Sequence, residues 1–134
     1  MATEEMREPT FLVLAALADG PRHGYATIQE IAKISDGKVT LRPGTLYGAL
    51  DRLTGDGLVR VDSEEVVNGR LRRYYTLTDD GAAVLAAQAE RLRANVAEAE
   101  RRLGLRARRS AGPMTGLALA LATTVLASAA LAAA

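Results

Sequence analysis

The sequence has no cysteine, no tryptophan and a single histidine, His23. Without cysteine the chain can form no disulfide, no thiolate zinc site and no cysteine nucleophile. A zinc site or a histidine-based triad would need partners for His23 that this inventory does not supply. Aromatic residues make up only 4% of the chain and none lies in residues 82–134, so no aromatic-walled ligand pocket is expected there. The composition therefore argues against an enzyme and predicts no metal or cofactor.

The chain also lacks a strong net charge, which is +1 over 134 residues. Residues 1–81 hold ten Lys and Arg against thirteen Asp and Glu, a net charge of −3. Residues 82–134 hold seven Arg against three Glu, a net charge of +4. Any nucleic-acid surface in the first part must therefore rest on local basic clusters and not on bulk charge.

Two helices are expected in the first part of the chain. The apolar run over residues 11–18 is too short to span a bilayer and predicts a buried helix that starts at Pro9-Thr10 and ends at Gly20-Pro21. A second helix is expected from about Tyr25 to Ser35, with a core stripe made of Ile28, Ile31 and Ala32.

Residues 41–59 predict a third helix, around which the rest of the chain is organised. Pro43 suits the first helical position, where its missing N–H would have no partner. Leu46, Leu50 and Leu53 fall on one apolar stripe. The opposite face is polar or small and carries Thr45, Tyr47, Gly48, Asp51 and Arg52. Such a face can lie against a flat polar surface such as the major groove of DNA.

A β-hairpin is expected after this helix, with strands over 58–62 and 71–77 and a turn at Asn68-Gly69, where both residues tolerate positive φ. Three helices followed by a hairpin predict a winged helix-turn-helix. The hairpin, or wing, carries Arg70, Arg72 and Arg73, which suit phosphate contact or a narrow minor groove. The alternative is that these arginines only pair with Glu64 and Glu65 on the partner strand, and we favour the DNA interpretation.

The helix expected after Thr78 carries an apolar seam of the coiled-coil type, with residues three and four apart. A narrow apolar stripe on a long helix needs a partner, which predicts a homodimer that presents two reading helices to a palindromic operator. The alternative is that the helix folds back on its own domain, as is expected near Leu85. The dimerisation residues predicted are Leu85, Ala89, Leu92, Val96, Ala99 and Leu103.

Several motifs together resemble the PadR family of bacterial transcriptional regulators over roughly Phe11 to Leu103. They are His23-Gly24-Tyr25, Pro43–Tyr47, Gly57–Val59, Arg73–Tyr75, Leu77-Thr78 and Gly81. The resemblance implies a small winged-helix repressor that dimerises through a C-terminal helix. Some members of the family are released from DNA by phenolic acids or drug-like aromatics, which implies an effector whose identity this sequence does not give.

The resemblance also implies DNA-binding residues. Thr45, Tyr47 and Gly48 would face the groove, and Arg52 would lie nearer the DNA backbone. The remaining candidates lie near phosphates or in the wing: His23, Tyr25, Arg42, Arg70 and Arg72. Arg42 stands where relatives often have an N-capping serine, which leaves its side chain free to reach a phosphate. The alternatives are that His23 is satisfied by backbone, that Tyr25 and Tyr47 are core-edge aromatics, and that one of Tyr74 and Tyr75 packs inward.

Beyond Gly104 the composition changes to a basic segment over 105–113 and then to an uncharged stretch over 114–134. A helix of that length would span a bilayer, but its five leucines and one valine contribute only about −2 to −4 kcal/mol to insertion. The alternatives are an alanine-rich helix packed on the dimer or a partner protein, or a truncated membrane segment. We favour the anchor slightly, because an uncharged end of this length is hard to keep in water.

The sequence thus predicts a mainly α fold with a small β-hairpin, in four parts. These are a winged helix-turn-helix over 9–80, a dimerisation helix over 81–104, a basic linker over 105–113 and an apolar tail over 114–134 that is a candidate transmembrane helix. The expected function is a sequence-specific, homodimeric DNA-binding repressor. It would be cytoplasmic, with a tether to the inner membrane if the tail inserts. The alternative is a winged-helix interaction module that assembles with a membrane protein through its C-terminal helices.

Overall fold

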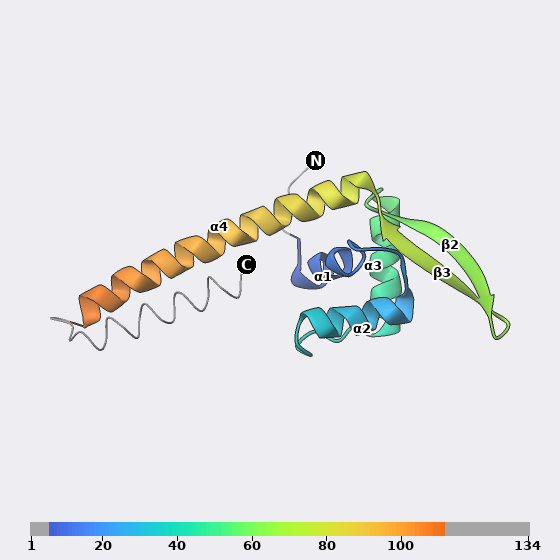
Figure 1. Cartoon of the computed structure of the whole chain (residues 1–134), viewed down its shortest axis with the longest axis horizontal. Helices are drawn as coiled ribbons and strands as arrows, with labels where there is room; N and C mark the ends of the chain where they lie inside the picture. The colour runs from blue at the N-terminus through green and yellow to red at the C-terminus, as the bar shows by residue number, and fades with distance from the viewer. Residues whose placement is uncertain (1–5, 112–134) are drawn as a thin grey trace. The chain divides into compact units, whose positions relative to one another are not determined.

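Residues 6–111, the part of the chain that this computed structural model describes, form helices and a small sheet (Figure 1). They are α1 (Glu8–Ala16), β1 (Arg22–His23), α2 (Gly24–Ile34), α3 (Pro43–Gly55), β2 (Val59–Val67), β3 (Arg70–Leu77) and α4 (Asp79–Ser110). The chain divides into two units, residues 1–92 and residues 93–134. The first unit contains the three short helices, the sheet and the first turns of α4.

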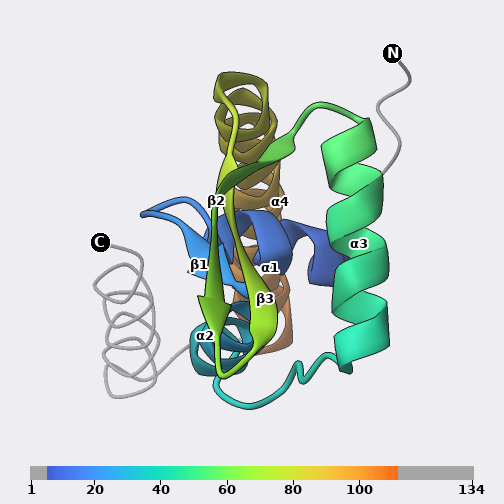
Figure 2. The same cartoon turned by 90° about the vertical axis from the view of Figure 1, so that its right-hand side faces the viewer.

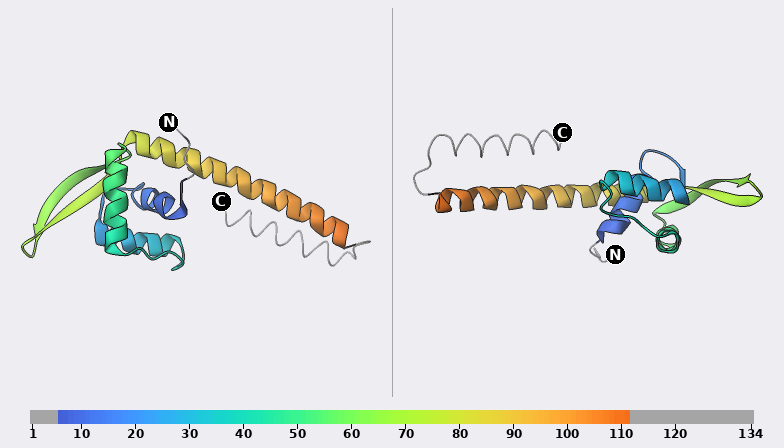
Figure 3. Two further views of the ribbon diagram at one scale, coloured as in Figure 1. Left: turned by 180° about the vertical axis from the view of Figure 1, so that it is seen from behind. Right: turned by 90° about the horizontal axis from the view of Figure 1, so that it is seen from below.

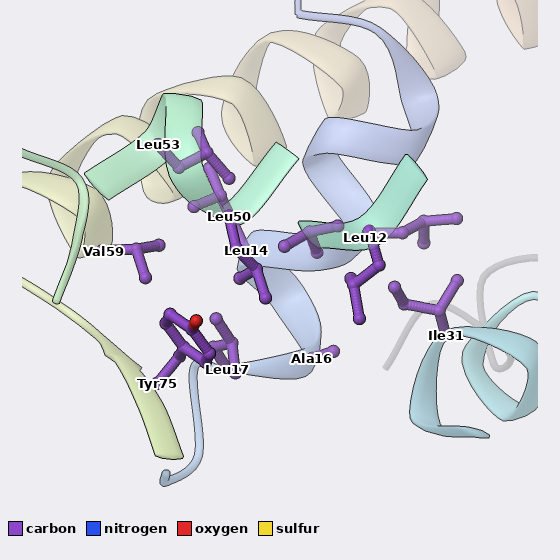
Figure 4. Packing of buried hydrophobic residues seen from close by; sticks show 11 residues of the cluster. Leu12, Leu14, Ala16, Leu17, Ile31, Leu50, Leu53, Val59 and Tyr75 are labelled. Carbon is purple, nitrogen blue, oxygen red and sulfur yellow. The ribbon is translucent and has the colours of Figure 1, made fainter. Parts of the chain in front are cut away.

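The core of the first unit is built around α1, which is apolar on nearly every side and is therefore buried among other elements. Leu12, Val13 and Leu14 of α1 are buried, and so are the three leucines predicted for the apolar stripe of α3. Val59 from β2 and Tyr75 from β3 close the cluster from the sheet, and Figure 4 shows their side chains pointing toward Leu14 and Leu17. The predicted helices are confirmed, with their ends shifted by a few residues.

The wing is confirmed as an antiparallel hairpin of β2 and β3, in which Val67 pairs with Arg70. Asn68 and Gly69 have φ of 53° and 77°, as expected for a two-residue turn with positive φ at both positions. The hairpin is a twisted ribbon that extends away from the short helices (Figure 3). The sheet also contains β1, which pairs with β3 and which two residues alone gave no pattern to predict.

The start of α4 is fixed to the corner between α3 and β2. The Thr78 hydroxyl accepts a hydrogen bond from the Gly81 amide at 3.0 Å, which caps the helix, and donates one to the Gly57 carbonyl at 2.6 Å. Gly81 is buried, and a Cβ at this position would overlap the Leu58 carbonyl. Glycine is required here by the close approach of two backbones.

The helix α4 continues past Gly104 to Ser110, so a linker that begins at residue 105 is wrong for residues 105–110. One glycine inside a helix costs only about 1 kcal/mol relative to alanine, and the surrounding Leu, Ala and Arg are good helix formers. Arg108 and Arg109 lie in the last turn, where positive charge is favourable near the free carbonyls.

Among the predicted seam residues, Leu85 packs against the core, as the fold-back alternative expects. Leu92, Val96 and Leu103 are exposed. No helix within residues 6–111 is both long and apolar enough to cross a bilayer. The predicted tail over 114–134 lies outside the described residues.

Candidate nucleic-acid interface

The helix α3 presents a polar face opposite its buried leucines. Pro43 occupies the first turn, and Arg42 is the N-cap residue with no side-chain hydrogen bond to the helix. Its exposed guanidinium is therefore not used for capping, as the sequence predicted. Thr45, Tyr47 and Gly48 are all exposed, so the three positions predicted to face DNA lie on the accessible side of the helix.

Glycine on this face is not required by the fold. A Cβ at Gly48 would meet no atom within 4 Å, and neither would one at Gly44 in the first turn. Glycine inside a helix is about 0.5–1 kcal/mol less favourable than alanine. The two residues leave a shallow surface where another backbone could approach α3 closely.

Tyr47 links α3 to the start of α2. A Cβ at Gly24 would overlap the Tyr47 hydroxyl, so the ring lies directly against the Gly24 backbone. Tyr47 is nevertheless 46% exposed, and Tyr25 on the first turn of α2 is 66% exposed. Tyr47 therefore packs partly at the edge of the core, as one alternative expected, whereas the Tyr25 side chain projects into solvent. The role of Gly24 as a platform was not predicted, because sequence spacing does not show which backbone a ring will touch.

His23 is the N-cap residue of α2. Its Nδ1 accepts a hydrogen bond from the Ala26 amide at 3.3 Å, and its ring meets Tyr74 edge to face with centroids 5.6 Å apart. Partial burial lowers the pKa of His23, and the nearby Arg72 charge lowers it further. The neutral form is therefore favoured. These contacts match the alternative of a histidine satisfied by backbone, and they leave Nε2 as the nitrogen available to donate.

The wing arginines differ from one another in their partners. Arg73 Nε donates to Glu64 Oε1 at 3.1 Å, and Arg72 Nη1 lies 3.8 Å from Glu65 Oε1. The structure thus bears out the pairing alternative for these two side chains. Arg70, beside the hairpin turn, is exposed and has no carboxylate partner within residues 6–111. It is the wing cation most available to a partner.

An open groove of about 720 Å³ is lined by residues of the wing, of the start of α2 and of the middle of α3. Figure 2 shows the wing and these two helices from the side of the wing. Five of the predicted DNA-binding residues line the groove: His23 from β1, Tyr25 from α2, Tyr47 from α3, and Arg70 and Arg72 from the wing. Arg73 and Asp51 also line it. Strict strand alternation separates Arg73 from Arg70 and Arg72, but a twisted ribbon can present both faces to one groove.

Other predicted residues lie away from this groove. Thr45, Gly48 and Arg42 lie on the exposed surface of α3 and its N-cap and do not line the groove. Arg52 Nη2 donates to the Thr10 hydroxyl at 3.3 Å, so its side chain is directed toward α1. Within residues 6–111, no three His, Asp or Glu side chains are grouped so that they could hold a metal ion. The groove therefore offers hydroxyls, ring faces and guanidinium groups, which suit an anionic polymer better than a cation.

The model of the transcriptional regulator PadR-like family matches residues 13–87, which is more than half of the chain. The chain belongs to the PadR-like family. The match includes the second half of α1, all of α2, α3 and the wing, and the start of α4. The resemblance stated from the motifs is thereby confirmed, and with it a family of transcriptional regulators that are not enzymes.

Two relatives and one solved structure illustrate the likeness of this PadR-like chain. It is 47% identical over 78 residues to an uncharacterised 37.1 kDa protein in transposon Tn4556 of Streptomyces fradiae, which is 58% of this chain and 21% of that protein. It is 41% identical over 73 residues to a transcriptional regulator of Mycobacterium tuberculosis, which is 54% of this chain and 64% of that protein. The chain therefore spans less than two thirds of each of these relatives.

The solved structure is that of Bacillus subtilis PadR in complex with operator DNA. It matches with a TM-score of 0.54 and 22% identity over 60% of this chain and 46% of that one. At this identity the likeness concerns the fold. It confirms the winged-helix architecture that the order of helices and strands predicted.

Proposed function

We propose that this PadR-like chain binds operator DNA as a homodimer and represses transcription. The observation that carries the proposal is the exposed face of α3, where Thr45, Tyr47 and Gly48 lie opposite a fully buried leucine stripe. That face has a shape that suits a flat polar partner, and the fold leaves it uncovered among the described residues. The operator complex of the Bacillus subtilis PadR, which has the same fold, supports DNA as that partner.

The groove beside α3 supports the same proposal through charge. Arg70 and Arg72 line it from the wing, and Tyr25 and Tyr47 add hydroxyls from α2 and α3. Phosphate contacts of this kind position a protein on DNA, while base edges supply sequence information. Gly48 has no side chain to read a base, so shape and phosphate contacts carry more of the recognition here than base edges do.

Dimerisation is proposed through the seam of α4. Leu92, Val96 and Leu103 are exposed along one helix, with Ala89 before them and Ala99 between Val96 and Leu103. Exposed apolar side chains at this spacing are typical of a helix that packs on a second copy of itself. Two copies would present two α3 helices to a palindromic site.

Repression, release by an effector and a cytoplasmic location are proposed from the family resemblance. The composition argues against aromatic walls for an effector site in residues 82–134, where no aromatic residue occurs. The alternative of an interaction module on a membrane protein depends on residues 114–134, which lie outside the described residues, so nothing in the structure favours it.

The decisive experiment compares binding of the full chain to DNA from its own upstream region and to a random duplex, over a range of salt concentrations. We expect tighter binding to the upstream DNA and an affinity that falls as salt rises, because phosphate contacts release counterions. Equal affinity for the two duplexes at moderate salt would refute the repressor.

The wing is tested by the double substitution Arg70→Ala and Arg72→Ala. We expect weaker binding to every duplex and a salt slope that flattens by about 1 to 2, because each arginine that no longer neutralises a phosphate reduces the slope by up to roughly 1. Arg91→Ala with Arg106→Ala removes the same charge from α4 and serves as the matched control. Unchanged binding in the wing variant would exclude the wing from the interface.

A further inference from the structure

The wing of this chain carries its own carboxylates beside the arginines proposed to meet DNA. Glu64 faces Arg73 and Glu65 faces Arg72 across the two strands, in register with one another. All four side chains are about half exposed. The arginines line the groove and the glutamates do not. A phosphate that approaches Arg72 or Arg73 therefore meets a cation that is already paired.

The two pairs are weak enough to open. Exposed ion pairs typically contribute about 0–1 kcal/mol, and the 3.8 Å separation of Arg72 and Glu65 is near the limit for such a pair. A DNA phosphate can therefore replace Glu65 as the partner of Arg72. The favourable free energy of that phosphate contact is smaller than it would be for an arginine with no carboxylate partner.

Glu65 differs from Glu64 in being held in place independently of its arginine. The Tyr74 hydroxyl donates to Glu65 Oε1 at 2.6 Å, and the Tyr74 ring packs against His23. His23 is fixed in turn as the cap of α2. These contacts hold the Glu65 carboxylate beside Arg72 without help from the ion pair itself.

We propose that Glu65 competes with DNA phosphate for Arg72 and so weakens binding to DNA of any sequence. This inference rests on the proposed function, because it assumes that the groove receives DNA. Random DNA is held almost entirely through phosphates. Operator DNA also meets Arg72 through phosphate, so an internal competitor lowers both affinities by a similar factor.

Glu65→Gln tests the proposal, because glutamine keeps the acceptor for Tyr74 and removes the charge. At about 0.1 M salt we expect binding to a random duplex to tighten by about three- to tenfold, with a salt slope steeper by up to about 1 as one more cation meets phosphate. Binding to the upstream duplex should tighten by a similar factor, because the same arginine–phosphate contact is strengthened in both complexes.

The matched control is Asp62→Asn. Asp62 lies on the same strand and pairs with Arg60 at 3.5 Å, but neither residue lines the groove. The substitution removes the same charge and should leave both affinities unchanged. The gain of Glu65→Gln should also disappear in the double variant with Arg72→Ala, because the competition acts through Arg72.

The outcomes separate the two hypotheses. If the native chain shows no preference for its upstream DNA, the proposed function fails and this inference fails with it. If the native chain shows the preference but Glu65→Gln leaves the random affinity and salt slope unchanged, only the competition is refuted. Weaker binding by Glu65→Gln would mean that Glu65 orients Arg72 toward DNA, and an equal gain in Asp62→Asn would mean a bulk charge effect. Either result would overturn the proposal.

Discussion

The helices α3 and α4 carry large apolar side chains at similar helical spacing but bury them to very different extents. Leu46, Leu50 and Leu53 of α3 are at most 2% exposed. Leu92, Val96 and Leu103 of α4 are 43%, 55% and 62% exposed. The first set packs on elements of the same unit, whereas the second stays exposed in the described part of the chain. Periodicity shows that a helix has a packing face, but it does not show whether the partner lies in the same chain.

The largest effect on stability is expected from a substitution in the buried leucine stripe of α3. Leu50→Ala removes a fully buried side chain between α1 and the sheet and should lower the free energy of unfolding by about 2–5 kcal/mol. Urea unfolding followed by circular dichroism measures this. A change below about 1 kcal/mol would mean that α3 is not packed as described.

The open seam of α4 should respond differently. Leu92→Glu with Val96→Glu places carboxylates on exposed positions, so the fold of a single chain should persist. In the proposed dimer the carboxylates would face each other, and we expect the dissociation constant to rise at least about 100-fold, about 2.7 kcal/mol. Analytical ultracentrifugation measures it. Ala94→Glu with Ala97→Glu puts the same charges on the same turns away from the seam, and an equal effect there would refute the seam.

Gly48→Ala probes the exposed face of α3. We propose that this face is open for DNA, whereas the seam of α4 is open for a second copy of the chain. The added methyl meets no atom, so helix propensity should raise the free energy of unfolding by up to about 1 kcal/mol. The same methyl should weaken DNA binding if a groove lies against this face. Gly55→Ala adds a methyl at the other end of α3, also in open space, and should leave DNA binding unchanged. Undiminished DNA binding by Gly48→Ala would remove this face from the interface.

The smallest effect is expected from pH. It should change the stability of the folded first unit and not the dimerisation through α4. The pKa of His23 is lowered in the folded chain, chiefly by burial, so the unfolded chain binds more protons as the pH falls through the ordinary value near 6.5. Stability is therefore full above about pH 6.5, falls below it and levels off below the lowered pKa. His23→Asn should flatten this dependence of the unfolding midpoint. The dimer dissociation constant should not change with His23, because α4 contains no histidine.

Much of the fold could be predicted because local signals agreed with one another. Pro43 and Asn68-Gly69 mark the ends of elements through their backbone conformations and Thr78 through its capping hydroxyl, and the apolar spacing identifies the buried face of α3. The change of composition after Gly104 predicts the end of the helix too early, since α4 continues to Ser110. A single glycine costs too little to stop a helix of good helix formers.

The site was less accessible to sequence reasoning. The candidate residues were identified by type and by resemblance, and their DNA contacts stay a prediction. Their partners depend on tertiary geometry: Arg52 turns toward Thr10, Tyr47 lies against Gly24, and Arg72 pairs with Glu65. The register of the hairpin can be extrapolated from the Asn68-Gly69 turn. For this reason the sequence could offer the pairing of the wing arginines with Glu64 and Glu65 as an alternative.

A single residue, Thr78, separates β3 from α4, and its hydroxyl is bonded to both Gly57 and Gly81. This one-residue connection and its two hydrogen bonds hold the start of α4 in a fixed position beside the wing. In the proposed dimer, the distance between two reading helices would then be set by the chain itself, and the protein would measure the separation of two half-sites as well as their sequence. A residue inserted beside Thr78 should shift the preferred half-site spacing, whereas a flexible connection would tolerate several spacings equally.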